Sequence, residues 1–116
     1  MASVKQCRAA VDRLVAALGD VDPQLRARHV PKRTVACRVT DLGVTFVGRL
    51  DEDGVHDVEQ SPEDDPEVDV RLTLDSDQLL ALAEGRDEFL PAWIRGRVQV
   101  SASMRDLLRL RTLFGL

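Results

Sequence analysis

Aromatic residues are scarce in this chain. They make up 3% of its 116 residues, and tyrosine is absent. A ligand held mainly by aromatic stacking is therefore not expected. The formal net charge is −4, whereas nucleic-acid-binding domains usually combine a basic face with stacking aromatic side chains. We predict no nucleic-acid partner.

Long apolar runs are missing as well. Every apolar stretch is interrupted within a few residues, far short of the roughly 20 residues that span a bilayer. The opening segment "MASVKQCRAAVDRL" lacks the continuous apolar centre of a signal peptide. The length fits one domain. We predict a single cytoplasmic domain, residues 1–116, with at most transient membrane contact.

Residues typical of catalytic and metal sites are few. Cys7 and Cys37 have no second Cys or His at the spacing of metal ligands, so we expect two buried reduced thiols, no metal and no disulfide. His29 precedes "VPKR" on a predicted surface, and His56 lies in an acidic strand flanked by turns. A Gly-rich nucleophile turn and a phosphate loop are both lacking. The sequence predicts neither catalysis nor a cofactor.

Acidic residues are concentrated in one part of the chain. Residues 50–77 carry twelve Asp/Glu and one Lys/Arg, whereas residues 1–49 carry nine Lys/Arg and four Asp/Glu. The simplest interpretation is a solvated surface of loops and turns. The alternative is a docking surface for a protein partner.

Apolar periodicity predicts an α+β fold. Helical spacing covers residues 4–18, 76–84, 87–95 and 103–116, and a short helix is expected from Pro23 toward His29. Alternation predicts strands at 33–40, 44–50, 55–60, 68–74 and 97–102. The turns "DLG" and "DEDG" make the first three strands an antiparallel meander. The expected architecture is a five-stranded, mostly antiparallel sheet with helices packed on one face.

Two of the predicted helices are unusually apolar. In residues 76–84 the leucines point in nearly every direction, which predicts a helix covered on all sides. In the last helix an apolar arc of about 160° contains Arg111. That guanidinium either reaches the rim or pairs with an acid, or it meets a phosphate or carboxylate head group at a cavity mouth.

Three segments together are similar to a known family. They are "VDVRLTLDSDQLLALAEG", "AWIRGRVQV" and "MRDLLRLRTL". Their order, with Gly85 ending one helix and Trp93-Ile94 before Gly96, resembles the sterol carrier protein family, also called the type-2 nonspecific lipid-transfer domain. The resemblance covers residues 67–113, while the N-terminal half agrees in element order.

The resemblance implies an open five-stranded sheet with helices on one side and a tunnel between the layers. That tunnel accepts fatty acyl chains, acyl-CoA, sterols or phospholipids. A lipid ligand, which such a domain binds and can transport, is therefore the expected partner. The expected lining residues are Leu79, Leu82, Phe89, Trp93, Val100, Met104, Leu107, Leu108 and Arg111.

The alternative to a lipid-binding tunnel is a filled core. Each buried methylene contributes roughly 0.8 kcal/mol, so a sixteen-carbon chain would gain on the order of 12 kcal/mol before ordering costs. Such a ligand needs almost no polar site. The same leucines could instead pack against one another in a non-catalytic protein-interaction module of the same fold. An apolar cavity of several hundred cubic ångströms between sheet and helices would distinguish the two.

Overall fold

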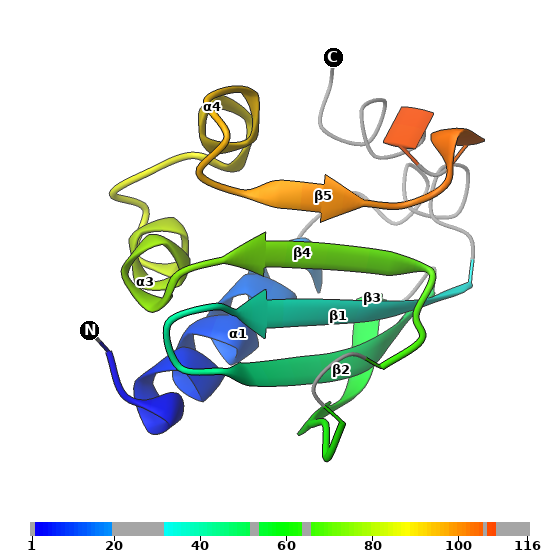
Figure 1. Cartoon of the computed structure of the whole chain (residues 1–116), viewed down its shortest axis with the longest axis horizontal. Helices are drawn as coiled ribbons and strands as arrows, with labels where there is room; N and C mark the ends of the chain where they lie inside the picture. Colours follow the sequence, from blue (N-terminus) through cyan, green and yellow to red (C-terminus); the bar gives the residue numbers. More distant parts are fainter. Residues whose placement is uncertain (1, 20–31, 52–53, 64–65, 106, 109–116) are drawn as a thin grey trace.

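A computed structural model describes residues 2–19, 32–51, 54–63, 66–105 and 107–108. The described helices and strands follow one another in the order that the sequence predicts (Figure 1). Their bounds are α1 Val4–Gly19, β1 Arg33–Val39, β2 Val44–Asp51, β3 Gly54–Gln60, β4 Val70–Leu74, α3 Ser76–Ala83, α4 Phe89–Ile94 and β5 Gln99–Ser101.

The five strands form one sheet in the order β3-β2-β1-β4-β5. Three of the four pairings are antiparallel, and the central pair, β1 with β4, is parallel. The predicted fold class is therefore confirmed. The sequence distance between β1 and β4 permits this parallel pairing, because parallel neighbours need a long crossover rather than a hairpin.

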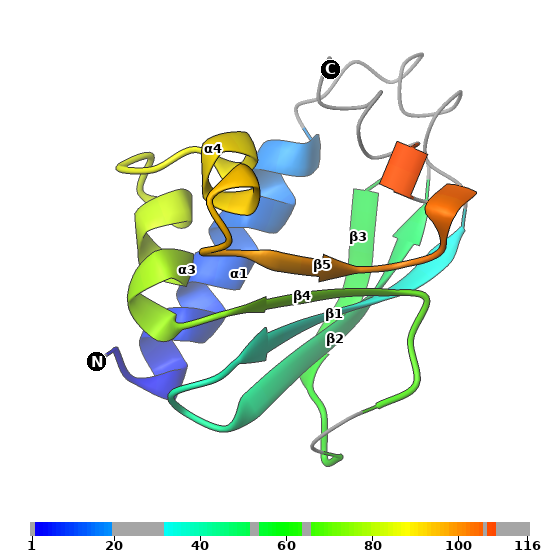
Figure 2. The same cartoon turned by 45° about the horizontal axis from the view of Figure 1, so that its top comes forward.

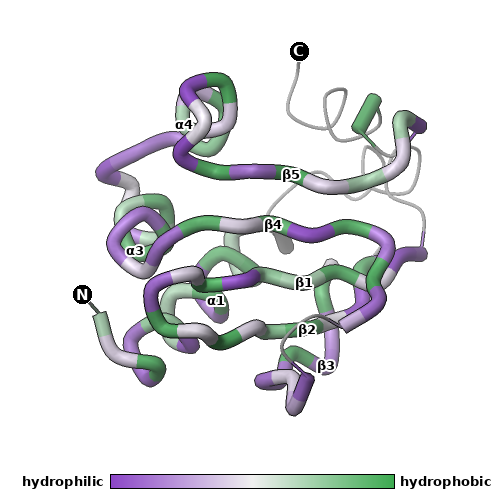
Figure 3. Tube along the Cα trace, viewed as in Figure 1, coloured by the Kyte–Doolittle hydropathy of each residue, from purple (hydrophilic) through white to green (hydrophobic). Residues whose placement is uncertain are grey.

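One face of the sheet is apolar. Phe46, Cys37, Leu72 and Val100 lie opposite one another in β2, β1, β4 and β5. Because side chains alternate between faces along a strand, these four point the same way, and all of them belong to or pack against the buried core. The alternation along β4 and β5 is visible in Figure 3.

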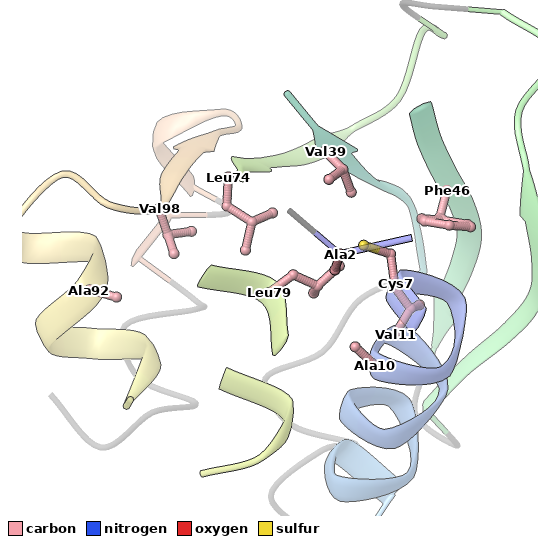
Figure 4. Packing of buried hydrophobic residues seen from close by; sticks show 10 residues of the cluster. All are labelled: Ala2, Cys7, Ala10, Val11, Val39, Phe46, Leu74, Leu79, Ala92 and Val98. Atoms are coloured by element: carbon pink, nitrogen blue, oxygen red, sulfur yellow. The ribbon is translucent and has the colours of Figure 1, made fainter. Parts of the chain in front are cut away.

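The helices cover this apolar face. In Figures 1 and 2 the three described helices lie on the same side of the sheet. Figure 4 shows Cys7 of α1, Leu79 of α3 and Ala92 of α4 in the same core. The full set of buried core residues is Ala2, Cys7, Ala10, Val11, Val39, Phe46, Leu74, Leu79, Ala92 and Val98.

Helix ends follow the predicted signals. Asp75 is the N-cap of α3, and its carboxylate accepts a hydrogen bond from the backbone N–H of Gln78 at 2.7 Å. Gly85 and Gly96 follow α3 and α4 with φ of 74° and 80°, the left-handed conformation that glycine adopts without strain. Each glycine therefore ends the helix before it, as expected.

Several details differ from the prediction. Strands β4 and β5 and helix α4 are shorter than expected. Helix α3 is not covered on all sides: Leu80 and Leu82 are only half-buried. Cys7 is fully buried as predicted, whereas Cys37 is only half-buried.

Two predicted helices lie wholly or partly outside the described residues. The short helix from Pro23 toward His29 lies entirely outside them. Of the last helix, residues 104, 105, 107 and 108 are described and are helical. The backbone N–H of Leu107 donates to the carbonyl of Ser103 at 2.9 Å, so this helix begins at Ser103 as predicted.

Candidate functional site

The candidate site residues fall into groups that differ in burial. Leu79 is 1% exposed and contributes to the core. A side chain that lines a space large enough for water keeps accessible surface, so Leu79 is packed against neighbours in this structure. Its role in lining a ligand site stays a prediction.

A second group of candidate residues lies on α3, α4 and the edge strand β5. Leu82, Phe89, Trp93 and Val100 are all half-buried. The rings of Phe89 and Trp93 have centroids 5.8 Å apart and planes tilted by 52°, a favourable arrangement for an aromatic pair. Leu82, Phe89 and Val100 pack against the core, and all four side chains keep surface available for contact.

A third group is exposed. Met104 is 72% exposed and Leu108 is 54% exposed, whereas Leu107 is half-buried. Residues 104 and 105 lie beyond the far end of β5 from α4 (Figures 1 and 2). Met104 and Leu108 are thus not enclosed between sheet and helices in this structure. Arg111, and with it the question of its partner, lies outside the described residues.

Sequence reasoning did not single out Ile94 as a site residue. It is 76% exposed at the end of α4, while Ala92 is the residue of that helix that is buried. The pair Trp93-Ile94 is part of the family resemblance. Helix α4 has only six residues, however, which is too few for apolar periodicity to predict which of its faces is buried. Exposed apolar side chains therefore lie at both ends of β5.

Polar side chains join α3 to the segment around α4. Asp87 accepts hydrogen bonds from Nε2 of Gln78 at 2.9 Å and from Nε of Arg97 at 3.1 Å. The hydrogen bond from Gln78, aided by the Arg97 charge, holds the pKa of Asp87 below its ordinary value, while partial burial opposes this shift.

The described residues also line an open pocket of about 330 Å³. It lies where β4 meets the start of α3 and the connection from α4 to β5. Its lining residues are Thr40, Thr73, Leu74, Asp75, Gln78, Gly96, Arg97 and Gln99. This pocket, whose surface is as polar as it is apolar, is not the apolar cavity between sheet and helices that the sequence predicts, and that cavity stays a prediction.

The candidate catalytic residues His56 and Cys37 do not line this pocket. Nε2 of His56 contacts Oδ1 of Asp51 at 2.9 Å on the β2–β3 hairpin. Burial, with a contribution from the neighbouring Cys7, raises the pKa of Cys37 to about 12, which leaves it a neutral thiol and a poor nucleophile near pH 7. No group of three His, Cys, Asp or Glu within the described ranges is placed to hold a metal ion.

In the described part of the chain, no helix is both long enough and apolar enough to cross a membrane.

Solved structures with the same fold include sterol carrier proteins. The crystal structure of sterol carrier protein 2 gives a TM-score of 0.62 at 17% identity, covering 96% of this chain and 92% of that one. The solution structure of palmitated SCP2L2 from Aedes aegypti gives 0.63 at 19% identity, covering 99% and 96%.

An enzyme also contains a similar fold. The inverting sec-alkylsulfatase Pisa1 from Pseudomonas sp. gives a TM-score of 0.58 at 19% identity. The match covers 89% of this chain but only 15% of the sulfatase, so this chain corresponds to a small part of that enzyme.

Sequence comparison provides the family. A search of curated protein sequences finds no match. The family model described as the SCP-2 sterol transfer family matches residues 12–115, which is nearly the whole chain and includes the three segments singled out above. The chain therefore belongs to the SCP-2 sterol transfer family.

Proposed function

We propose that this chain binds the acyl chain of a lipid between the apolar face of its sheet and the helices, close to α4 and β5. The observation that carries the proposal is a cluster of half-buried apolar side chains on α3, α4 and β5, namely Leu82, Phe89, Trp93 and Val100. Exposed apolar residues at both ends of the strand extend it. Apolar surface left available in this way is typical of a binding site.

The chemistry of the cluster suits a flexible hydrocarbon. Its side chains are aliphatic or aromatic, and the sheet beneath them presents Leu72 and Val100 opposite each other. An acyl chain gains roughly 0.8 kcal/mol for each methylene that leaves water. Affinity therefore rises with chain length and needs no catalytic group, which supports a carrier rather than an enzyme.

Palmitate is the first ligand to test, because the similar Aedes aegypti protein was solved in a palmitated form. Native mass spectrometry of the purified chain, before and after removal of lipid, should detect one fatty acid per protein when palmitate is restored. Trp93 is the only tryptophan, so its fluorescence should report the same titration.

A matched pair of valine substitutions locates the site. Val100→Asp places a carboxylate beside the proposed acyl chain and should abolish palmitate binding. Val4→Asp makes the same change in the first turn of α1, where Val4 is 37% exposed, and should leave binding intact. Leu107→Asp should behave like Val100→Asp. Unchanged binding in both the Val100 and Leu107 variants would refute the site.

A filled core has a different outcome in the same experiment. In that case the purified protein carries no lipid and takes up no fatty acid, phospholipid or sterol. The proposal that residues 1–116 act as one lipid-binding domain would then be replaced by a search for a protein partner at the acidic surface of residues 50–77.

A further inference from the structure

Helix α4 is held in place by few contacts of its own. It has six residues, and its N-cap Glu88 makes no side-chain capping hydrogen bond. Isolated helices shorter than about 12 residues are marginal in water. Ala92 is its buried residue. Its position must therefore be fixed largely by groups outside the helix.

Glycines in the left-handed conformation stand before and after α4. Gly85 and Gly96 have φ of 74° and 80°, and a Cβ built on either would meet no heavy atom within 4 Å. Hydrogen bonds rather than side-chain packing restrain the backbone at these two positions: the N–H of Gly85 donates to the carbonyl of Leu82 at 3.3 Å, and that of Gly96 to the carbonyl of Trp93 at 3.1 Å. Rotation there would move the segment between them, which carries the Phe89–Trp93 ring pair, with little steric cost.

A cluster of polar side chains links the two ends of this segment. Asp87 precedes α4 and Arg97 follows it, and the two form an ion pair with Nη2 to Oδ2 at 2.8 Å. The same Oδ2 accepts from Nε2 of Gln78 at 2.9 Å, and Gln78 is a buried residue of α3. One carboxylate oxygen thus ties both ends of the α4 segment to the neighbouring helix.

We propose that Asp87, Arg97 and Gln78 form a latch that holds α4 closed over the lipid site and sets the rate at which lipid enters and leaves. This inference rests on the proposed function and adds a regulated step to it. Asp87 is a positioning residue: it acts through α4 and does not touch the lipid.

The geometry favours a latch that opens rather than a permanent link. The side chains of Asp87 and Arg97 are 23% and 37% exposed, so water can replace their contact. Arg97 and Gln78 also line the open pocket of about 330 Å³, which gives water a route to the pair. Local opening of α4 would take the buried Ala92 and the half-buried Phe89 away from the core, which is a small part of the core as a whole.

The test compares Asp87→Asn with Glu84→Gln. Asp87→Asn removes the charge that Arg97 contacts and retains the size of the side chain. Glu84→Gln removes the exposed Arg86–Glu84 ion pair, which does not connect the two ends of the α4 segment. Hydrogen exchange is followed at the amides of Ala92 and Arg95, whose hydrogen bonds go to the carbonyls of Glu88 and Pro91.

Asp87→Asn should speed exchange at these amides and the release of bound palmitate by about fivefold, the upper range for a partly exposed ion pair. Glu84→Gln should change neither rate. Release is measured by stopped-flow fluorescence of Trp93 after mixing loaded protein with excess vesicles. Joint exchange of charges, Asp87→Arg with Arg97→Asp, should restore part of both rates.

The two measurements separate the possible failures. Faster amide exchange with unchanged palmitate release would refute the role of the latch in ligand exchange. Unchanged amide exchange would refute the latch itself. A chain that binds no lipid would overturn the proposed function, and with it the ligand role of the latch, while amide exchange would still show whether Asp87 holds α4.

Discussion

Replacing Leu79 by alanine measures how closely α3 packs on the sheet. Leu79 is 1% exposed and lies among Leu74, Ala2 and Cys7 (Figure 4). The substitution removes three carbon atoms, worth about 2.4 kcal/mol of transfer free energy, and leaves a cavity. The expected loss in the free energy of unfolding is about 3–4 kcal/mol, a large share of the roughly 5–15 kcal/mol that stabilises a typical domain.

Urea unfolding followed by circular dichroism gives this free energy, with Leu82→Ala as the matched control. Leu82 is half-buried in the same helix, so its loss should be about half as large. A loss below about 1 kcal/mol for Leu79→Ala, at unchanged m-value, would refute the packing argument. It would mean that Leu79 borders open space.

The stabilisation that palmitate gives to the same variants distinguishes a packing role of Leu79 from contact with the ligand. A ligand at one hundred times its dissociation constant stabilises the folded state by about 2.7 kcal/mol. If Leu79 serves packing alone, that increment should be the same in Leu79→Ala as in the unmodified chain. A clearly smaller increment would show that Leu79 contacts the lipid, as the sequence predicts.

Other measurements follow from single contacts. Ser76→Ala should cost about 1–3 kcal/mol in urea unfolding, because the buried Ser76 hydroxyl accepts from the N–H of Ala2 at 3.1 Å; a neutral result would contradict this. Hydrogen bonds from the backbone and hydroxyl of Thr34 lower the pKa of Asp69, so its stabilisation is complete above about pH 4 and is lost as pH falls through the lowered value. Stability measured against pH should therefore fall less steeply in acid for Asp69→Asn. The pKa of both thiols is raised chiefly by burial, that of Cys37 to about 12, so both should react slowly with Ellman's reagent at pH 8 and rapidly in urea, and a fast thiol in the native state would disprove it.

Local signals predicted the elements well. Alternation located the strands, because one face of the sheet is apolar and the other is not. The N-cap Asp75 and the terminating Gly85 were correct because capping depends on neighbouring residues. Two of the three family-like segments cover β4, α3, the end of α4 and the start of β5, where much of the candidate site also lies.

Contacts between residues far apart in the chain could not be predicted from the sequence. The parallel register of Val39 with Leu74 joins residues far apart in the chain, and no local pattern encodes it. The ion pair between Asp87 and Arg97 joins residues that precede and follow α4, so no helical or strand spacing indicates it. The exposure of Ile94 depends on how α4 sits against α3 and β5, which is a property of the assembled fold.

The position of β1 at the centre of the sheet has a consequence for how the chain folds. Strands β1, β2 and β3 are joined by short turns and can pair soon after they meet. Strand β4 must instead find β1 across a segment that contains β2 and β3, and pairing between strands so far apart in the sequence is slow. We therefore expect the meander to form first and to act as the template on which β4, β5 and their helices assemble. The half of the chain that carries the proposed lipid-binding residues would then acquire its structure last.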